Sequence, residues 1–251
     1  MKKKNKAIYL LFLMPFVYFA TACFVVWLVK TSGIYPSGSD TMYHVYRGDY
    51  VYNAIKSGNW YPLYDPAWYN GVEILRYWSP FPAYVMAFCQ YLAGGSQFGA
   101  YLFYIGGVCF LGACVWPFIG RGFNRPYLGA FIGLLWFFMP NNLCAIFIEG
   151  NLARSLSMIF LPVFIYSVYK YLYNHKLRYI PLMVFTFLLM ELCHLGYAGM
   201  VAIAVIIYGI VYIIQKGRKK AVLDVVISMI FGFMLLGIWL GASLRGGITS
   251  L

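Results

Sequence analysis

Long apolar runs, separated by short polar turns, dominate the pattern of hydrophobic and polar positions along the chain. An α-helix needs about 20 apolar residues to cross a hydrocarbon core of about 30 Å. The runs lack the two-residue alternation of membrane β-strands. The pattern predicts an all-α polytopic membrane protein with about seven transmembrane helices, near residues 7–29, 98–119, 127–147, 152–171, 179–193, 196–214 and 221–243.

One long polar segment, residues 30–78, interrupts this pattern after the first run. It holds four of the seven acidic residues of the chain. The apolar stretch at 80–92 is short and starts at Pro80, which favours an interfacial helix over a span. We therefore predict a single membrane domain, 1–251, with an extracytoplasmic loop at 30–96 that carries juxtamembrane and interfacial helices. We also expect the chain to be the N-terminal part of a longer protein.

The distribution of charge predicts how the chain threads the bilayer. Only 10% of the residues are charged, against roughly 25% in soluble domains, and mean hydropathy is +0.73. If 80–92 does not cross, thirteen of the nineteen Lys and Arg residues share the side of the N-terminus. The positive-inside rule makes that side cytoplasmic. The net charge of +12 then marks inner loops of a multi-pass cell-membrane protein, and we expect no nucleic-acid partner.

The same threading, which used no acidic residue, gathers every acid except Asp224 on the outer face. Glu149 and Arg154 fall at a second outer loop, either as a local ion pair that caps a helix or as a second acid and a phosphate-binding arginine. Glu191 and His194 fall at a third outer turn. Ionisable groups at membrane depth are candidates for function, and a helix-to-helix hydrogen bond is the structural alternative.

Within the polar segment, one helical face carries three groups with useful chemistry. Asp40, His44 and Arg47 are spaced i, i+4, i+7 on a helix predicted over residues 42–55, so they share a face. A carboxylate, an imidazole and a guanidinium on one face could handle a hydroxyl and a phosphate together. The alternative is that Asp40 is only an N-cap and that the other two lie on a solvated face.

Aromatic residues are dense just after this helix. Trp60 and Tyr61 begin a stretch that is typical of an interfacial aromatic belt. The same side chains could stack on a sugar ring or flank a polyprenyl chain. The remaining acids of the segment, Asp49, Asp65 and Glu73, share no such pattern, and we interpret them as ordinary loop residues.

The order of short motifs along the chain resembles the GT-C superfamily of membrane glycosyltransferases, which use polyprenyl-phosphate-linked sugars. A lysine-tailed span precedes Gly-x-Asp-x-x-x-His-x-x-Arg, then come Gly-Asn-Trp-Tyr-Pro, Asn-Gly, Tyr-x-x-Pro-x-Pro-x-Tyr and Glu-Gly-Asn-Leu-Ala-Arg. The chain is most similar to the bacterial group labelled "6-pyruvoyl-tetrahydropterin synthase related domain; membrane protein". No cluster of zinc-ligand histidines accompanies that label in the sequence.

The resemblance implies a seven-span GT-C core whose first outer loop carries the reaction centre. It implies sugar transfer from a polyprenyl-phosphate donor to a glycan or protein acceptor in cell-envelope glycan assembly. Asp40 would act on the acceptor hydroxyl and Glu149 would be the second acid. The implied substrate-binding residues are His44, Arg47, Arg154, His194, Trp60 and Tyr61. Some relatives use a divalent metal, Mg²⁺ or Mn²⁺, which Asp40 and Glu149 would hold here.

Two other classes of function fit parts of the pattern. A non-enzymatic membrane protein, such as a lipid or glycan carrier or a scaffold, could keep the fold without the chemistry. A solute transporter would need discontinuous helices and polar residues at the midplane, and the predicted spans are nearly free of polar residues.

Overall fold

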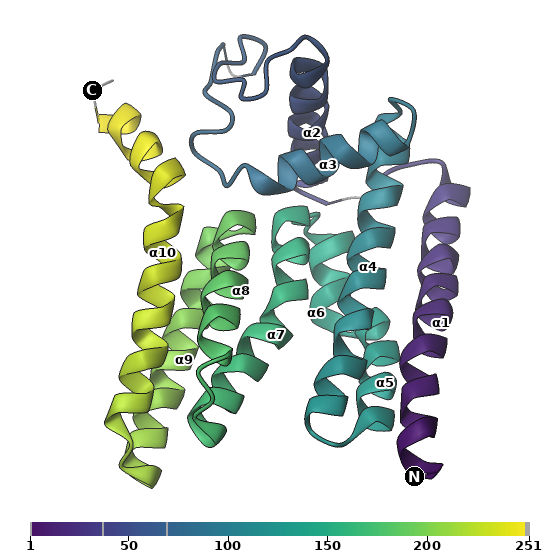
Figure 1. Cartoon of the computed structure of the whole chain (residues 1–251). Coiled ribbons are helices and arrows are strands. Elements are labelled where there is room, and N and C mark those ends of the chain that lie inside the picture. Colours follow the sequence, from purple (N-terminus) through teal and green to yellow (C-terminus); the bar gives the residue numbers. More distant parts are fainter. Residues whose placement is uncertain (1, 37, 69, 249–251) are drawn as a thin grey trace. The chain divides into compact units, whose positions relative to one another are not determined.

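The chain is all-helical in a computed structural model that describes residues 2–36, 38–68 and 70–248 (Figure 1). Within these ranges there is no strand, only an isolated bridge between Asp65 and Val72. The predicted all-α class is therefore confirmed. The longer helices are α1 (Lys2–Ser32), α2 (Thr41–Lys56), α3 (Phe81–Leu92), α4 (Gln97–Gly122), α5 (Pro126–Leu135), α7 (Leu152–Asn174), α8 (Tyr179–Cys193), α9 (Leu195–Lys216) and α10 (Lys219–Ile248).

Among the described residues, six segments are long and apolar enough to cross a membrane. They match six of the seven predicted spans. The remaining one, α8, has only 15 residues, fewer than the ~17 that a span normally needs. The stretch predicted to be interfacial forms α3, a helix of 12 residues, and its place at the membrane surface stays a prediction.

The predicted span over residues 127–147 is not one regular helix. After α5, the chain forms a 3₁₀ turn, η1 (Trp136–Phe138), a short helix, α6 (Pro140–Leu143), and a π-helical segment, η2 (Cys144–Ile148). The break falls at Met139, whose backbone is extended, as expected for a residue before proline. Short π-helical segments of this kind occur frequently at functional sites.

The chain divides into two compact units, and one of the three boundaries between them falls inside α7. Unit 1 comprises residues 1–61 and 82–162, and unit 2 comprises residues 62–81 and 163–251. Each unit is therefore built from segments that are far apart in the sequence. The predicted single membrane domain stays a prediction.

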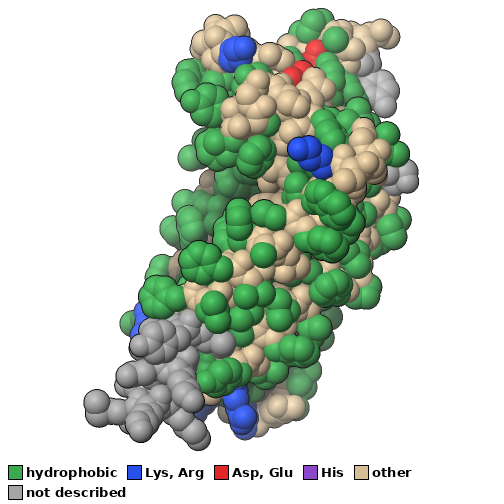
Figure 2. Space-filling view, turned by 90° about the vertical axis from the view of Figure 1, so that its right-hand side faces the viewer, with side chains coloured by type: hydrophobic (Ala, Val, Ile, Leu, Met, Phe, Trp, Pro, Cys, Tyr) green, Lys and Arg blue, Asp and Glu red, His purple; other side chains and the backbone are tan. Residues whose placement is uncertain are grey.

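In unit 1, α4 packs against α1 and α5. Close approach of α4 and α5 depends on two glycines, since a Cβ on Gly120 would lie 2.6 Å from the Cα of Gly129. Small residues at such contacts are typical of membrane helix pairs. Tyr18 of α1 is buried and donates a 2.8 Å hydrogen bond to the Ala130 carbonyl of α5. On the face that carries α1, hydrophobic side chains cover the middle and charged side chains lie towards the two ends (Figure 2).

In unit 2, α8 packs against α9 and α10, and the segment 62–81 is fastened to these helices by side-chain hydrogen bonds to backbone carbonyls. Ser79 Oγ donates to the Glu191 carbonyl at 3.0 Å, and Trp239 Nε1 donates to the Leu75 carbonyl at 2.8 Å. The last part of the polar segment is thus a folded element of unit 2.

Helices α2 and α3 of unit 1 are joined by a buried amide. Gln90 Nε2 donates to Asp49 Oδ1 at 2.6 Å and to the Gly95 carbonyl at 3.1 Å, and the side chain is 2% exposed. Gln90→Ala leaves two acceptors without their donor, so we expect it to lower the free energy of unfolding by about 1–3 kcal/mol. Thermal unfolding in detergent measures this effect. Tyr91→Ala, at an exposed neighbour on α3, is the control, and equal destabilisation by both variants would contradict the assigned role of Gln90.

Candidate functional site

The two acids singled out from the sequence, Asp40 and Glu149, meet in unit 1. The backbone N–H of Asp40 donates to the Glu149 carbonyl at 3.1 Å. Ser39 Oγ lies 3.1 Å both from that carbonyl and from Asp40 Oδ1. We call this contact between residues 38–41 and 149–150 the Asp40–Glu149 junction. It places the start of α2 beside the loop that leads into α7.

Glycines allow the two backbones of the junction to come this close. A Cβ on Gly38 would lie 2.6 Å from the backbone N of Gly150, and a Cβ on Gly150 would lie 2.6 Å from that of Thr41. Gly150 also has a φ of +67°, a left-handed conformation that costs a residue with a Cβ about 1–2 kcal/mol. Any side chain at either position would therefore push the loops apart.

Two helix N-termini converge at the junction. Asn151 caps α7, since its Oδ1 accepts the Arg154 N–H at 2.9 Å. Asp40 occupies the N-cap position of α2, as the structural alternative predicts, but its carboxylate makes no capping hydrogen bond. The N-terminus of a helix carries partial positive charge and free N–H groups, which favour bound anions.

Glu149 lies directly after the π-helical segment and is paired with Arg154. Glu149 Oε2 and Arg154 Nη1 are 2.7 Å apart, and the Cys144 thiol donates to Glu149 Oε1 at 3.3 Å. The Glu149 side chain is 37% exposed and that of Arg154 19%. The ion pair considered from the sequence is therefore present, and the carboxylate remains accessible from solvent.

His44 and Arg47 face the interior of unit 1, so the alternative of a solvated helix face is wrong. Arg47 is 1% exposed and His44 9%. The Arg47 guanidinium lies over the ring of Tyr43, 5.4 Å from its centroid, a cation–π contact. Burial lowers the pKa of Arg47, and the neighbouring Tyr43 and Tyr104 oppose that shift. The helix face shared by Asp40, His44 and Arg47 thus runs from the junction into the core.

The aromatic candidates, Trp60 and Tyr61, belong to unit 1, whereas the histidine candidate, His194, belongs to unit 2. Trp60 and Tyr61 are exposed in unit 1, and the Trp60 carbonyl accepts a 2.6 Å hydrogen bond from Tyr84 Oη. Burial, with a further contribution from Tyr61, raises the pKa of Tyr84 to about 12. His194 belongs to unit 2, where its Nδ1 accepts the Tyr197 N–H and caps α9. The structure thus gives His194 a capping role in unit 2, whereas the other candidate substrate-binding residues belong to unit 1.

The other three acids of the polar segment have structural partners. Asp49 binds Gln90, Asp65 Oδ1 accepts the Ala67 N–H at 3.0 Å, and Glu73 pairs with Arg76. Glu191 is buried in unit 2, and its Oε2 has no hydrogen-bond partner among the described residues. Asp65 and Glu73 lie in loops, as interpreted from the sequence, whereas Asp49 lies on α2 and joins it to α3.

The donor set at the junction does not form a metal site by itself. In the described parts of the chain, no three His, Cys, Asp or Glu side chains lie close enough together to hold a metal ion. One of the two carboxylates at the junction, that of Glu149, is already paired with Arg154. We therefore derive no step through a metal.

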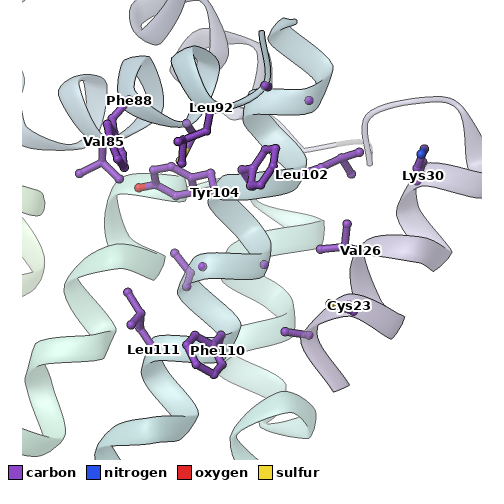
Figure 3. Close-up of a pocket in the computed structure, with 18 of the residues that line it drawn as sticks. Cys23, Val26, Lys30, Val85, Phe88, Leu92, Leu102, Tyr104, Phe110 and Leu111 are labelled. Atoms are coloured by element: carbon purple, nitrogen blue, oxygen red, sulfur yellow. The ribbon is translucent and has the colours of Figure 1, made fainter. Parts of the chain in front are cut away.

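An apolar groove of about 880 Å³ runs along unit 1 between α1, α3 and α4 (Figure 3). Cys23, Val26 and Phe110 line one part of it, Phe88 lines another part, and the Lys30 side chain lies where α1 ends. Tyr104 forms a wall of this groove and donates a 2.9 Å hydrogen bond to the Leu152 carbonyl in the first turn of α7. This hydrogen bond links the groove to the first turn of α7, the helix that follows the junction.

Sequence reasoning missed Tyr104 and the two junction glycines. Tyr104 lies in a uniformly apolar run, where no spacing distinguishes it from the other aromatic residues. Gly38 and Gly150 flank the two predicted acids, and this shared pairing of Gly with an acid was the available signal.

A protein-family profile described as "6-pyruvoyl-tetrahydropterin synthase related domain; membrane protein" matches residues 75–251, well over half of the chain. The chain belongs to this family. The description of this PTPS-related family agrees with the membrane-spanning helices. Glu149, Arg154 and His194 lie inside the matched region, whereas Asp40, His44, Arg47, Trp60 and Tyr61 precede it. No curated protein and no solved structure matches the chain.

Proposed function

We propose that this PTPS-related protein is a membrane glycosyltransferase of GT-C type. It transfers a sugar from a polyprenyl-phosphate donor to an extracytoplasmic acceptor hydroxyl during cell-envelope glycan assembly. The observation that carries the proposal is the Asp40–Glu149 junction, where two acids meet at two helix N-termini. The apolar groove, which Tyr104 links to the first turn of α7, would give the donor's hydrocarbon chain a place to bind.

Asp40 is the group best placed to activate an acceptor. Its carboxylate is half-buried and is held by Ser39 rather than by the helix, so one oxygen can take a proton. In the proposed step the acceptor oxygen attacks the anomeric carbon and its proton passes to Asp40. The bond from that carbon to the phosphate oxygen breaks, and its electron pair leaves with the polyprenyl phosphate.

The junction offers positive charge that complements the leaving phosphate. The N-termini of α2 and α7 carry partial positive charge, and Arg154 adds a guanidinium suited to bidentate phosphate binding. Glu149 holds Arg154 in the absence of donor. The leaving phosphate would replace the Glu149 carboxylate as the partner of Arg154. Arg154 would then stabilise the negative charge that develops on the phosphate, and such stabilisation accelerates the reaction.

The membrane orientation in this proposal comes from the charges. Within unit 1, the α4–α5 turn with Arg121 and Arg125 lies at the opposite end from the junction (Figure 1). If basic loops are cytoplasmic, the junction is extracytoplasmic, where a lipid-linked sugar would meet its acceptor.

A non-enzymatic carrier or scaffold with the same fold is the second candidate. The burial of Arg47 and the pairing of Glu149 with Arg154 favour it, since both arginines are already engaged. A carrier would bind the lipid-linked sugar without breaking the sugar–phosphate bond.

Cells that lack the protein provide the test. We expect them to accumulate one polyprenyl-phosphate-linked sugar at least severalfold over wild-type cells and to lose one glycan modification, because the donor is no longer consumed. Mass spectrometry of extracted lipids and of envelope glycans measures both. An unchanged lipid-linked sugar pool together with unchanged glycans would reject the glycosyltransferase proposal.

A further inference from the structure

A second cavity lies in unit 2, far along the sequence from the residues of the junction. It has a volume of about 510 Å³ and lies where α7 ends and α10 begins. Its lining holds more charged side chains than that of the groove in unit 1. Three cations, Arg218, Lys219 and Lys220, line it with the single carboxylate of Asp224.

The carboxylate in this cavity is already engaged. Tyr171 Oη, on the last turns of α7, donates to Asp224 Oδ2 at 2.6 Å. Asp224 is half-buried, while the three cations are exposed. The cavity therefore presents an excess of positive charge that its one acid does not balance.

Arg218 and His175 contact each other across the cavity through Nη1 and Nε2. A guanidinium has only donors, so this ring nitrogen acts as the acceptor. His175 has a φ of +52°, a conformation that few residues other than glycine adopt. The backbone thus holds the imidazole in this position after α7 has ended.

The chain reverses direction here through Gly217, which has a φ of +67° and ends α9. Helix α10 starts two residues later with Lys219. The N-terminus of this 30-residue helix adds partial positive charge to the three cations. Backbone and side chains thus contribute charge of the same sign to one cavity.

We propose that this cavity binds a phosphate-bearing anion, with Arg218 and Lys220 as its main contacts. Arg binds phosphate oxygens in a bidentate manner, and Lys acts as a point charge. Basic pockets between membrane helices on the cytoplasmic side bind anionic lipid head groups, and the positive-inside rule makes this end of unit 2 cytoplasmic. The same chemistry would accept a soluble phosphate ester. The inference is independent of the proposed glycosyl transfer.

The test measures binding to the purified full chain in a neutral detergent. Thermal unfolding is followed while one of three additives is titrated: short-chain phosphatidylglycerol, phosphatidylcholine of the same chain length, or glycerol 3-phosphate without lipid. We expect phosphatidylglycerol or glycerol 3-phosphate to stabilise the protein and phosphatidylcholine to have little effect. Stabilisation by the lipid alone identifies a membrane head group, and stabilisation by glycerol 3-phosphate identifies a soluble ester.

The variant Arg218→Gln/Lys220→Gln removes two of the three cations. We expect it to weaken binding of the effective additive about 25-fold, since each basic residue near an anionic lipid contributes roughly fivefold. Both side chains are exposed, so the variant should unfold at the wild-type temperature without additive. Arg121→Gln/Arg125→Gln, at the basic α4–α5 turn of unit 1, is the control. Wild-type affinity in the first variant, equal weakening in the control, or no response to either phosphate additive would overturn the proposal.

Discussion

Gly150→Ala is expected to disrupt the Asp40–Glu149 junction, whereas Gly33→Ala should leave it intact. Both glycines have nearly the same positive φ, +67° and +69°. A Cβ on Gly150 would lie 2.6 Å from the backbone N of Thr41, while one on Gly33 would meet nothing within 4 Å. Strain of the left-handed backbone costs both variants about 1–2 kcal/mol. The overlap with Thr41 adds to that cost only in Gly150→Ala.

Thermal unfolding in detergent separates the two contributions. We expect Gly150→Ala to unfold at a clearly lower temperature than Gly33→Ala and to lose activity with its stability. Gly38→Ala, whose Cβ would overlap the backbone of Gly150 from the other side, should behave like Gly150→Ala. If all three variants unfolded at the same temperature, close backbone contact would not be what stabilises the junction.

Asp40→Asn should abolish sugar transfer while the protein stays folded. Asparagine has nearly the shape of aspartate but cannot take the acceptor proton, and a general base contributes roughly 10²–10⁴-fold to the rate. The Asp40 side chain caps no helix, so stability should change by less than about 1 kcal/mol. Complementation of cells that lack the protein, followed by quantification of the accumulated lipid-linked sugar, measures the loss.

Asp49→Asn is the matched control, because it makes the same substitution on the neighbouring helix α2. The side-chain amide of this variant would still offer an oxygen to Gln90, the partner of Asp49, so the variant should complement nearly as well as the wild type. Equal complementation by Asp40→Asn and Asp49→Asn would remove Asp40 from the reaction and favour the carrier alternative.

Hydrophobic patterning predicted most of the helices because lipid-spanning segments must be long and apolar. Helix α2 was predicted within one residue at each end, and Gly58 follows its C-cap with a φ of +87°. The break at Met139 was missed, although Pro140, Asn141 and Asn142 interrupt the apolar run there. The short length of α8 was visible in the sequence. Whether this helix crosses the membrane stays a prediction.

The candidate site was partly predictable because acids are rare in this chain. Charge placed Asp40 and Glu149 on the same predicted face, although they are far apart in the sequence, and the structure brings their backbones into contact. Charge could not show that Arg47 is buried, since helical spacing defines a face without showing what packs against it. His194 was selected as an ionisable residue, whereas its geometry is that of an N-cap, a role that any short acceptor side chain in a turn can fill.

Cleavage of the sugar–phosphate bond by the purified protein tests the central claim most directly. The protein is reconstituted into liposomes with lipid-linked sugars extracted from cells that lack it and with an extract that contains the acceptor, and free polyprenyl phosphate is quantified over time. We predict release by the wild type and by Asp49→Asn, and release at least about 100-fold slower by Asp40→Asn. Equal release by Asp40→Asn and the wild type, or no release by the wild type, would contradict the assignment of the Asp40–Glu149 junction as a glycosyl-transfer site.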